Sequence, residues 1–148
     1  MDFSSAHLAC RITVESFFHF VDARMFEQAA YQFAQEGVWH RHGDTLVGPQ
    51  QVLAALTAKD DRTVERHLVS TTHVEPVTAD TWCGSSYIQI VRGTRGAAPI
   101  PATSVTLGDF RFRCRAGDER VLLTHLESVP VFRLPDSDRP GHGPAGDV

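Results

Sequence analysis

The chain changes character at Thr63, where the stretch Thr63–Pro76 reads TVERHLVSTTHVEP. This stretch and the sequence after it are rich in Val, Ile, Thr, Trp and Tyr, the residue types that favour β-strands. Turn-forming residues interrupt this half of the chain at 76–80, 93–101 and 116–119. The pattern therefore predicts four long antiparallel strands.

The first part of the chain carries apolar residues at the three-to-four spacing of amphipathic helices. One such run covers residues 6–20, and a second covers residues 25–33. Asp22 lies at the junction between these two predicted helices. A third helix is predicted at 49–57, where a proline suits the helix start.

A short strand is predicted at residues 37–42, and a tight turn at 42–45 follows it, where Gly43 adopts a positive φ at low cost. Because the helices come first and the long strands later, the fold class is α+β, with the helices covering one face of a meandering sheet. We expect residues 1–134 to form one domain. Residues 135–148 contain three Pro and three Gly, and we expect a disordered C-terminal tail there.

The composition argues against several classes of protein. The chain has 148 residues, of which 42% are hydrophobic and 22% are charged, as in an ordinary globular domain. Its net charge of -4, without a dense Lys/Arg cluster, predicts no nucleic-acid partner. The three cysteines form no C-x-x-C motif, and no apolar run reaches the ~20 residues of a membrane span. With an N-terminus unlike a secretory signal, these features predict a cytoplasmic protein without a membrane partner.

Histidine is abundant, with eight residues in the chain. His40 and His42 share a strand face and could form half of a cupin-type metal site. The nearest carboxylate, Asp44, falls in the predicted turn instead of following on the strand. We therefore expect no metal and no cofactor, and a metal-dependent enzyme stays an alternative.

His67 lies near the start of the first long strand, where alternation directs either His67 or Leu68 toward the helices. A histidine facing an apolar pocket needs a partner for its second ring nitrogen, and a carboxylate at a helix junction such as Asp22 would supply one. Together the two would form a general base. The alternatives are that Asp22 caps the second helix and that His67 bonds solvent or backbone at the strand edge.

Four segments occur in a fixed order along the chain: FVDARMF at 20–26, GVWHR at 37–41, Gly48-Pro49, and ERHLVST at 65–71. They resemble the corresponding segments of SnoaL-like proteins, a family of the nuclear transport factor two-like superfamily. The resemblance covers residues 8–134. It implies a cone-shaped α+β barrel in which three N-terminal helices pack on a curved mixed, mainly antiparallel sheet and enclose a pocket. Because such proteins are often dimeric through the sheet, it also implies a homodimer or a higher homo-oligomer.

The pattern is most similar to that of scytalone dehydratase and related dehydratases, in which an aspartate after the first helix hydrogen-bonds a histidine at the start of the first long strand. Asp22 and His67 match these two positions, and His40 occupies the place of a pocket tyrosine. All three are candidate catalytic residues. The resemblance implies a cofactor-independent lyase or isomerase, of dehydratase or cyclase type. Its substrate would be a small hydrophobic or polyketide-like hydroxy-carbonyl compound that loses a proton next to the carbonyl group.

The later strands depart from the dehydratase pattern, since Arg92 stands in place of a histidine, and Phe110 and Phe112 stand in place of small residues. Together with Trp39 they are the candidate substrate-binding residues, although aromatic residues in strands packed on helices also fill cores. The alternative function is a non-catalytic ligand-binding or structural subunit, resembling the small subunit of ring-hydroxylating dioxygenases. In that case the cavity would be filled or blocked.

Overall fold

The computed structural model describes residues 3–134, and the tail predicted at 135–148 lies outside the described residues. The elements in chain order are α1 (Phe3–Asp22), α2 (Phe26–Ala30), β1 (Phe33–Arg41), β2 (Asp44–Val47), α3 (Gly48–Thr57), β3 (Thr63–Pro76), β4 (Thr81–Thr94), β5 (Ala102–Ala116) and β6 (Val121–Arg133). The prediction of four long strands after the helices is confirmed. Among the described residues, no helix has the length and the apolar content needed to cross a membrane.

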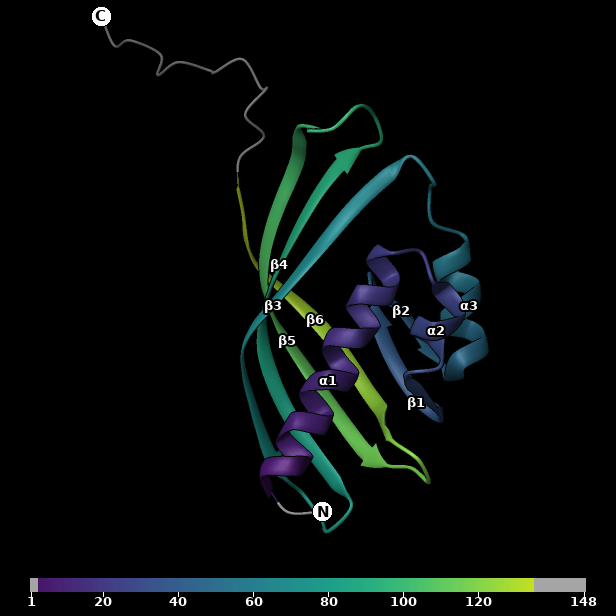
Figure 1. Cartoon of the computed structure of the whole chain (residues 1–148), viewed down its shortest axis with the longest axis vertical. Coiled ribbons are helices and arrows are strands. Elements are labelled where there is room, and N and C mark those ends of the chain that lie inside the picture. The colour runs from purple at the N-terminus through teal and green to yellow at the C-terminus, as the bar shows by residue number, and fades with distance from the viewer. Residues whose placement is uncertain (1–2, 135–148) are drawn as a thin grey trace, which may run out of the picture.

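The six strands form one mixed sheet in the order β2-β1-β6-β5-β4-β3. β1 and β6 pair in parallel, and the other neighbouring strands pair antiparallel. β2 and β3 end the sheet without pairing to each other, so the sheet is open and not a closed barrel. Figure 1 shows α1 running along the curved long strands, with α2 and α3 beside β1 and β2. This cone-like α+β arrangement confirms the predicted fold class.

The second helix is shorter than its apolar spacing predicts. α2 ends at Ala30, and the strand β1 already begins at Phe33, well before the predicted start at Gly37. Phe33 pairs with Leu123 of β6, and its ring packs edge-on against Phe17 with 5.4 Å between centroids. These tertiary contacts bury Phe33 as a strand residue, because packing outweighs the small differences in local helix propensity.

The core lies between α1 and the inner face of the sheet, toward which alternate side chains of β4, β5 and β6 point. The bulkiest fully buried side chains are Phe17, Phe110, Phe112, Leu56, Leu123 and Leu126. Gly84 of β4 leaves room for one of them, since a Cβ there would lie 2.3 Å from Cζ of Phe112. The outer face of the sheet carries exposed residues such as Arg111 and Arg113.

Candidate active site

A sharp helix end places Asp22 beside the sheet. The amide N–H of Met25 donates to the carbonyl of Phe20 at 2.8 Å. The amide N–H of Arg24 donates to the carbonyl of Val21 at 3.1 Å. Arg24 has a φ of 59°, so these bonds form a Schellman motif with a left-handed residue just after the helix. The motif ends α1 directly at Asp22 and leaves the carboxylate at the end of the helix.

The Asp22 carboxylate holds His67 at two points. Nδ1 of His67 lies 2.5 Å from Oδ1 of Asp22, and the backbone N–H of His67 donates to Oδ2 at 2.8 Å. The two side chains are nearly buried, with 8% of His67 and 12% of Asp22 exposed. The ring of Phe18 stacks on the imidazole with 4.8 Å between centroids. α2, by contrast, has no side-chain cap at its N-cap residue Met25, so Asp22 serves His67 instead.

This geometry determines which ring nitrogen of His67 is available. Because the carboxylate accepts a hydrogen bond at Nδ1, that nitrogen carries the hydrogen of the neutral imidazole and Nε2 keeps a lone pair. Nε2 has no hydrogen-bond partner among residues 3–134. Within that range no buried side-chain nitrogen or oxygen lacks a partner, so Nε2 is open to solvent.

His67 lines a pocket of about 360 Å³ between α1, β1 and the inner face of the long strands. Trp39 forms part of the wall, and its ring packs edge-on against Phe17 with 5.2 Å between centroids. The guanidinium carbon of Arg41 lies 5.2 Å from the centre of the Trp39 ring. Arg92 also lines the pocket. The fold thus brings together three predicted site residues, His67, Trp39 and Arg92.

His40 borders this pocket as well, but its ring faces the other side of the sheet. Side chains alternate along β1, and Trp39 takes the inner face, opposite Leu126 of β6. Nδ1 of His40 instead lies 3.2 Å from the hydroxyl oxygen of Thr45, and its ring lies 5.1 Å from that of His125. The structure therefore does not bring the imidazole of His40 to the aspartate–histidine pair.

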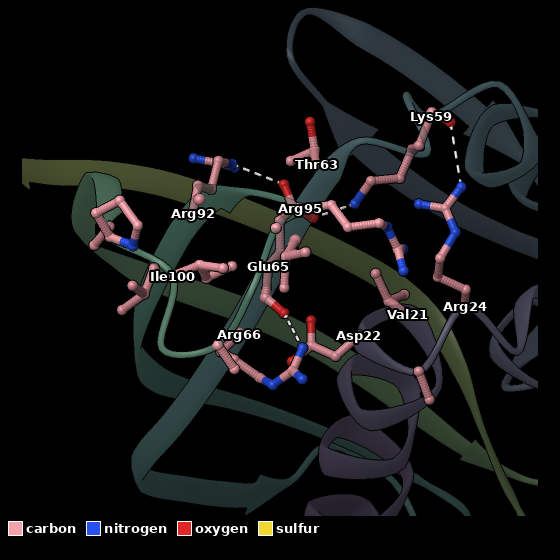
Figure 2. Close-up of a pocket in the computed structure, with 18 residues that line it drawn as sticks. Val21, Asp22, Arg24, Lys59, Thr63, Glu65, Arg66, Arg92, Arg95 and Ile100 are labelled. Atoms are coloured by element: carbon pink, nitrogen blue, oxygen red, sulfur yellow. Dashed lines mark hydrogen bonds and ion pairs between the residues drawn. The ribbon is translucent and has the colours of Figure 1, made fainter.

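A charge cluster that the sequence patterns did not single out lies next to His67. Nε of Arg92 donates to Glu65 at 2.7 Å, and Lys59 pairs with the other carboxylate oxygen (Figure 2). Burial by itself raises the pKa of Glu65, but the hydrogen bonds and charges of Lys59 and Arg92 outweigh burial and lower this pKa to about 2. Glu65 lies two residues before His67, a spacing that places both side chains on one face of β3. Its pairing with Arg92 depends on the register of β3 against β4.

The family model for the SnoaL-like domain matches residues 3–127, most of the chain. The chain belongs to the SnoaL-like family. Its fold is shared by the hexachlorocyclohexane dehydrochlorinase LinA Type2, with a TM-score of 0.78, 14% identity and 95% of each chain covered. LinA-type3 from Novosphingobium barchaimii LL02 gives 0.78 and 15% identity, covering 95% of this chain and 96% of that one. ActVI-ORFA from Streptomyces coelicolor gives 0.67 and 16%, covering 85% and 97%. No curated protein sequence matches the chain.

In this SnoaL-like domain, Phe110 and Phe112 lie in the core. They are 0% and 1% exposed, and neither is among the described residues that line the pocket of His67. Phe110 packs edge-on against Phe18 with 5.2 Å between centroids, and Phe18 in turn stacks on His67. The two phenylalanines therefore fill the core, and Phe110 supports the imidazole through Phe18.

The part of the SnoaL-like domain that the structure describes contains no group of three or more His, Cys, Asp or Glu residues arranged to hold a metal ion. His42 and Gly43 form the two-residue turn between β1 and β2, both with positive φ. Asp44 is exposed directly after this turn. It therefore cannot follow His40 and His42 along the same strand, as a cupin-type site would require.

Proposed function

We propose that the protein is a cofactor-independent lyase or isomerase in which His67 exchanges protons with the substrate and Asp22 orients His67. The observation that carries this proposal is the two-point hydrogen bonding of Asp22 to His67, which leaves Nε2 open beside a pocket. An imidazole held in this way is suited to general acid–base catalysis. Structures of the same fold include dehydrochlorinases, and this name describes an elimination. Their chemistry supports a lyase-type reaction for this protein.

The proposed reaction begins when Nε2 of His67 takes a proton from the carbon next to a carbonyl group. Asp22 accepts the hydrogen bond from Nδ1–H of His67 throughout and stabilises the imidazolium that forms. The imidazolium then donates this proton to a neighbouring hydroxyl group of the substrate, which leaves as water. In an isomerase, the same proton would return to a different carbon of the substrate.

In this proposal Arg92 stabilises the enolate. Within the described residues, its hydrogen bond to Glu65 uses Nε only, so its terminal nitrogens can donate to an oxyanion in the pocket. Trp39, Phe17 and Phe18 form apolar walls that suit a small hydrophobic or polyketide-like hydroxy-carbonyl compound. His40 would act only from the pocket rim, because its ring faces outward.

The tautomer of His67 tests the proposal directly, and nitrogen NMR of the histidine side chains can measure it. We expect the hydrogen on Nδ1 in the wild-type protein and a changed tautomer ratio in Asp22→Asn, where an amide replaces the acceptor. His73→Gln, at an exposed histidine, is the control for assignment. A wild-type His67 with its hydrogen on Nε2 would contradict the proposed base and favour the non-catalytic binding or structural role.

Activity gives the second test. A screen of hydroxy-carbonyl compounds for elimination or isomerisation should find a reaction that His67→Gln abolishes and His73→Gln leaves unchanged. Turnover that survives His67→Gln would contradict the assignment of His67, whose carboxylate partner is held at two points, whereas His73 and His125 each contact a carboxylate through one ring nitrogen.

We also propose that the protein acts as a homodimer in the cytoplasm. The outer face of the sheet exposes large apolar side chains, among them Leu68, Tyr87, Val131 and Phe132. The three cysteines are unpaired, which suits a reducing compartment. Light scattering coupled to size-exclusion chromatography should give the mass of two chains for the wild-type protein. Tyr87→Glu should reduce this mass to that of one chain. A wild-type monomer would contradict the dimer.

A further inference from the structure

Figure 2 shows a second, larger pocket, which shares lining residues with the pocket of His67. Its volume is about 620 Å³, and it lies between the end of α1, the start of β3 and the end of β4 with the loop that follows it. Val21, Lys59, Glu65 and Arg92 line both pockets. The cluster of Lys59, Glu65 and Arg92 is therefore a shared wall, and the larger pocket, called the basic pocket below, adjoins the proposed site.

Positive charge is concentrated around these two pockets. The basic side chains that line the basic pocket are Arg24, Lys59, Arg66, Arg92 and Arg95. The pocket of His67 adds Arg41 and Arg133. The two pockets thus hold seven of the 14 Lys and Arg residues of the chain but two of its 18 Asp and Glu residues. This excess is notable in a chain whose net charge is -4.

The two acidic groups in the pockets are already engaged. Asp22 accepts hydrogen bonds from His67, and Glu65 is shared between Lys59 and Arg92. One carboxylate therefore balances two cations in the shared wall. The remaining arginines of the basic pocket have no carboxylate left there to pair with.

Three arginines of the basic pocket are held by main-chain oxygens instead. Arg24 donates to the carbonyls of residues 59 and 60 at 3.4 and 3.3 Å. Arg66 donates to the carbonyl of the preceding residue at 2.7 Å, and Arg95 donates to that of Asp61 at 3.0 Å. Carbonyl oxygens orient a guanidinium but leave its charge unbalanced. Within residues 3–134, none of the three forms an ion pair with a carboxylate.

We propose that the basic pocket binds an oxyanion group of the substrate, so that the substrate of the aspartate–histidine pair is an organic acid. The guanidinium fork matches the planar geometry of a carboxylate and also that of a phosphate. The acidic group would lie among Arg24, Arg66 and Arg95, and the body of the molecule would extend past the shared wall toward His67. This inference rests on the proposed function for the reaction, but the anion site can be measured without turnover.

The first test compares three small aromatic probes on the full chain by calorimetry: cinnamate, its neutral amide cinnamamide, and phenyl phosphate. Cinnamate and cinnamamide have the same shape, so their difference in Kd isolates the charge. We expect cinnamate to bind about tenfold or more tightly than cinnamamide. We also expect this preference to shrink as salt is added, because salt screens charge. The tighter of cinnamate and phenyl phosphate identifies which oxyanion the site prefers.

The double variant Arg66→Gln/Arg95→Gln locates the site. Both arginines are exposed and outside the core, so the variant should keep the wild-type melting temperature while losing most of the preference for cinnamate. The control is Arg62→Gln, an exposed arginine in the loop just before β3 that pairs with Asp60 and does not line the basic pocket. Equal binding of cinnamate and cinnamamide by wild type, or an equal loss in the control, overturns the proposal.

Failure of this inference and failure of the proposed function are distinguishable. A preference for cinnamate in a wild-type protein for which the screen finds no turnover supports the acid site and removes only the reaction. Turnover that depends on His67 in a wild-type protein that binds cinnamamide as well as cinnamate overturns the acid site and leaves the reaction standing.

Discussion

The strand β3 carries two histidines that each pair with a carboxylate, and the two pairs differ in burial. His67, near the start, contacts Asp22 at two points with 8% and 12% of the side chains exposed. His73, near the end, lies 3.0 Å from Glu75, with 69% and 65% exposed. Water competes with the exposed pair, so it contributes little. The buried pair fixes one orientation of an imidazole beside a pocket, which shows that surroundings, not residue types, make the candidate site.

The largest expected difference between the two pairs is in activity. On the substrate found by screening, Asp22→Asn should lower kcat/KM by about 10²–10⁴-fold, the range that a positioned general base supplies. Glu75→Gln, at the exposed pair, should leave kcat/KM unchanged. Steady-state kinetics on both variants, with circular dichroism to verify folding, measure this difference. Equal effects of the two substitutions would remove the distinction between the pairs.

Glu65 sharpens the comparison, because it is a buried carboxylate on the same strand as the exposed Glu75. The pKa of Glu65, about 2, lies below the ordinary 4.5. Ionised Glu65 therefore contributes its full stabilisation of the folded state above about pH 4.5 and loses it as the pH falls toward 2. Protonation of Glu65 alone should lower the free energy of unfolding by about 3 kcal/mol across that window. Urea unfolding at several pH values should give a flatter profile for Glu65→Gln than for wild type. Parallel profiles would contradict the buried ion cluster.

The ring support of His67 is a third difference, since Phe18 stacks on this imidazole. We expect Phe18→Leu to destabilise the protein by about 1 kcal/mol and to lower kcat/KM about tenfold, because a loosened imidazole is less well oriented. Phe20→Leu is the control, on the same helix, where the ring is partly buried against the core. Thermal melts and kinetics on both variants check this expectation, and a larger activity loss at Phe20 would count against the role of Phe18.

The smallest effect is expected at His40. Its ring faces Thr45 and His125 on the outer side of the sheet, so His40→Ala should change kcat/KM by less than about twofold, as expected for a surface substitution. A loss comparable to that of Asp22→Asn would show that this imidazole reaches the substrate. It would contradict the expected difference between His67 on the inner face and His40 on the outer face.

The sequence predicted the parts of this fold that depend on local pattern. The four long strands follow from residue type and turn residues, and the pairing of Asp22 with His67 was predicted from a helix junction, a strand start and the family resemblance. The early start of β1 was not predicted, because Phe33 is drawn into the sheet by contact with β6. The orientation of His40 required the register of β1 against its neighbours.

The charge cluster required the same kind of information. Glu65 and Arg92 are far apart in sequence and meet only because β3 and β4 pair in one register, which a single sequence does not specify. Lys59 joins them from the loop after α3. The basic pocket was equally hidden, since its arginines come from the turn after α1, from β3, and from β4 and the loop after it, and they gather only in the folded chain.

The hydrogen bond from the backbone N–H of His67 to Asp22 also occupies a donor at the open edge of the sheet. β3 is the last strand of the sheet, and a strand at an open edge presents unpaired N–H groups that another chain can extend into an aggregate. Asp22 occupies one of these donors with Oδ2 and places a negative charge at the edge. The carboxylate that orients the imidazole therefore also serves as a gatekeeper against fibril-like growth from this side of the sheet.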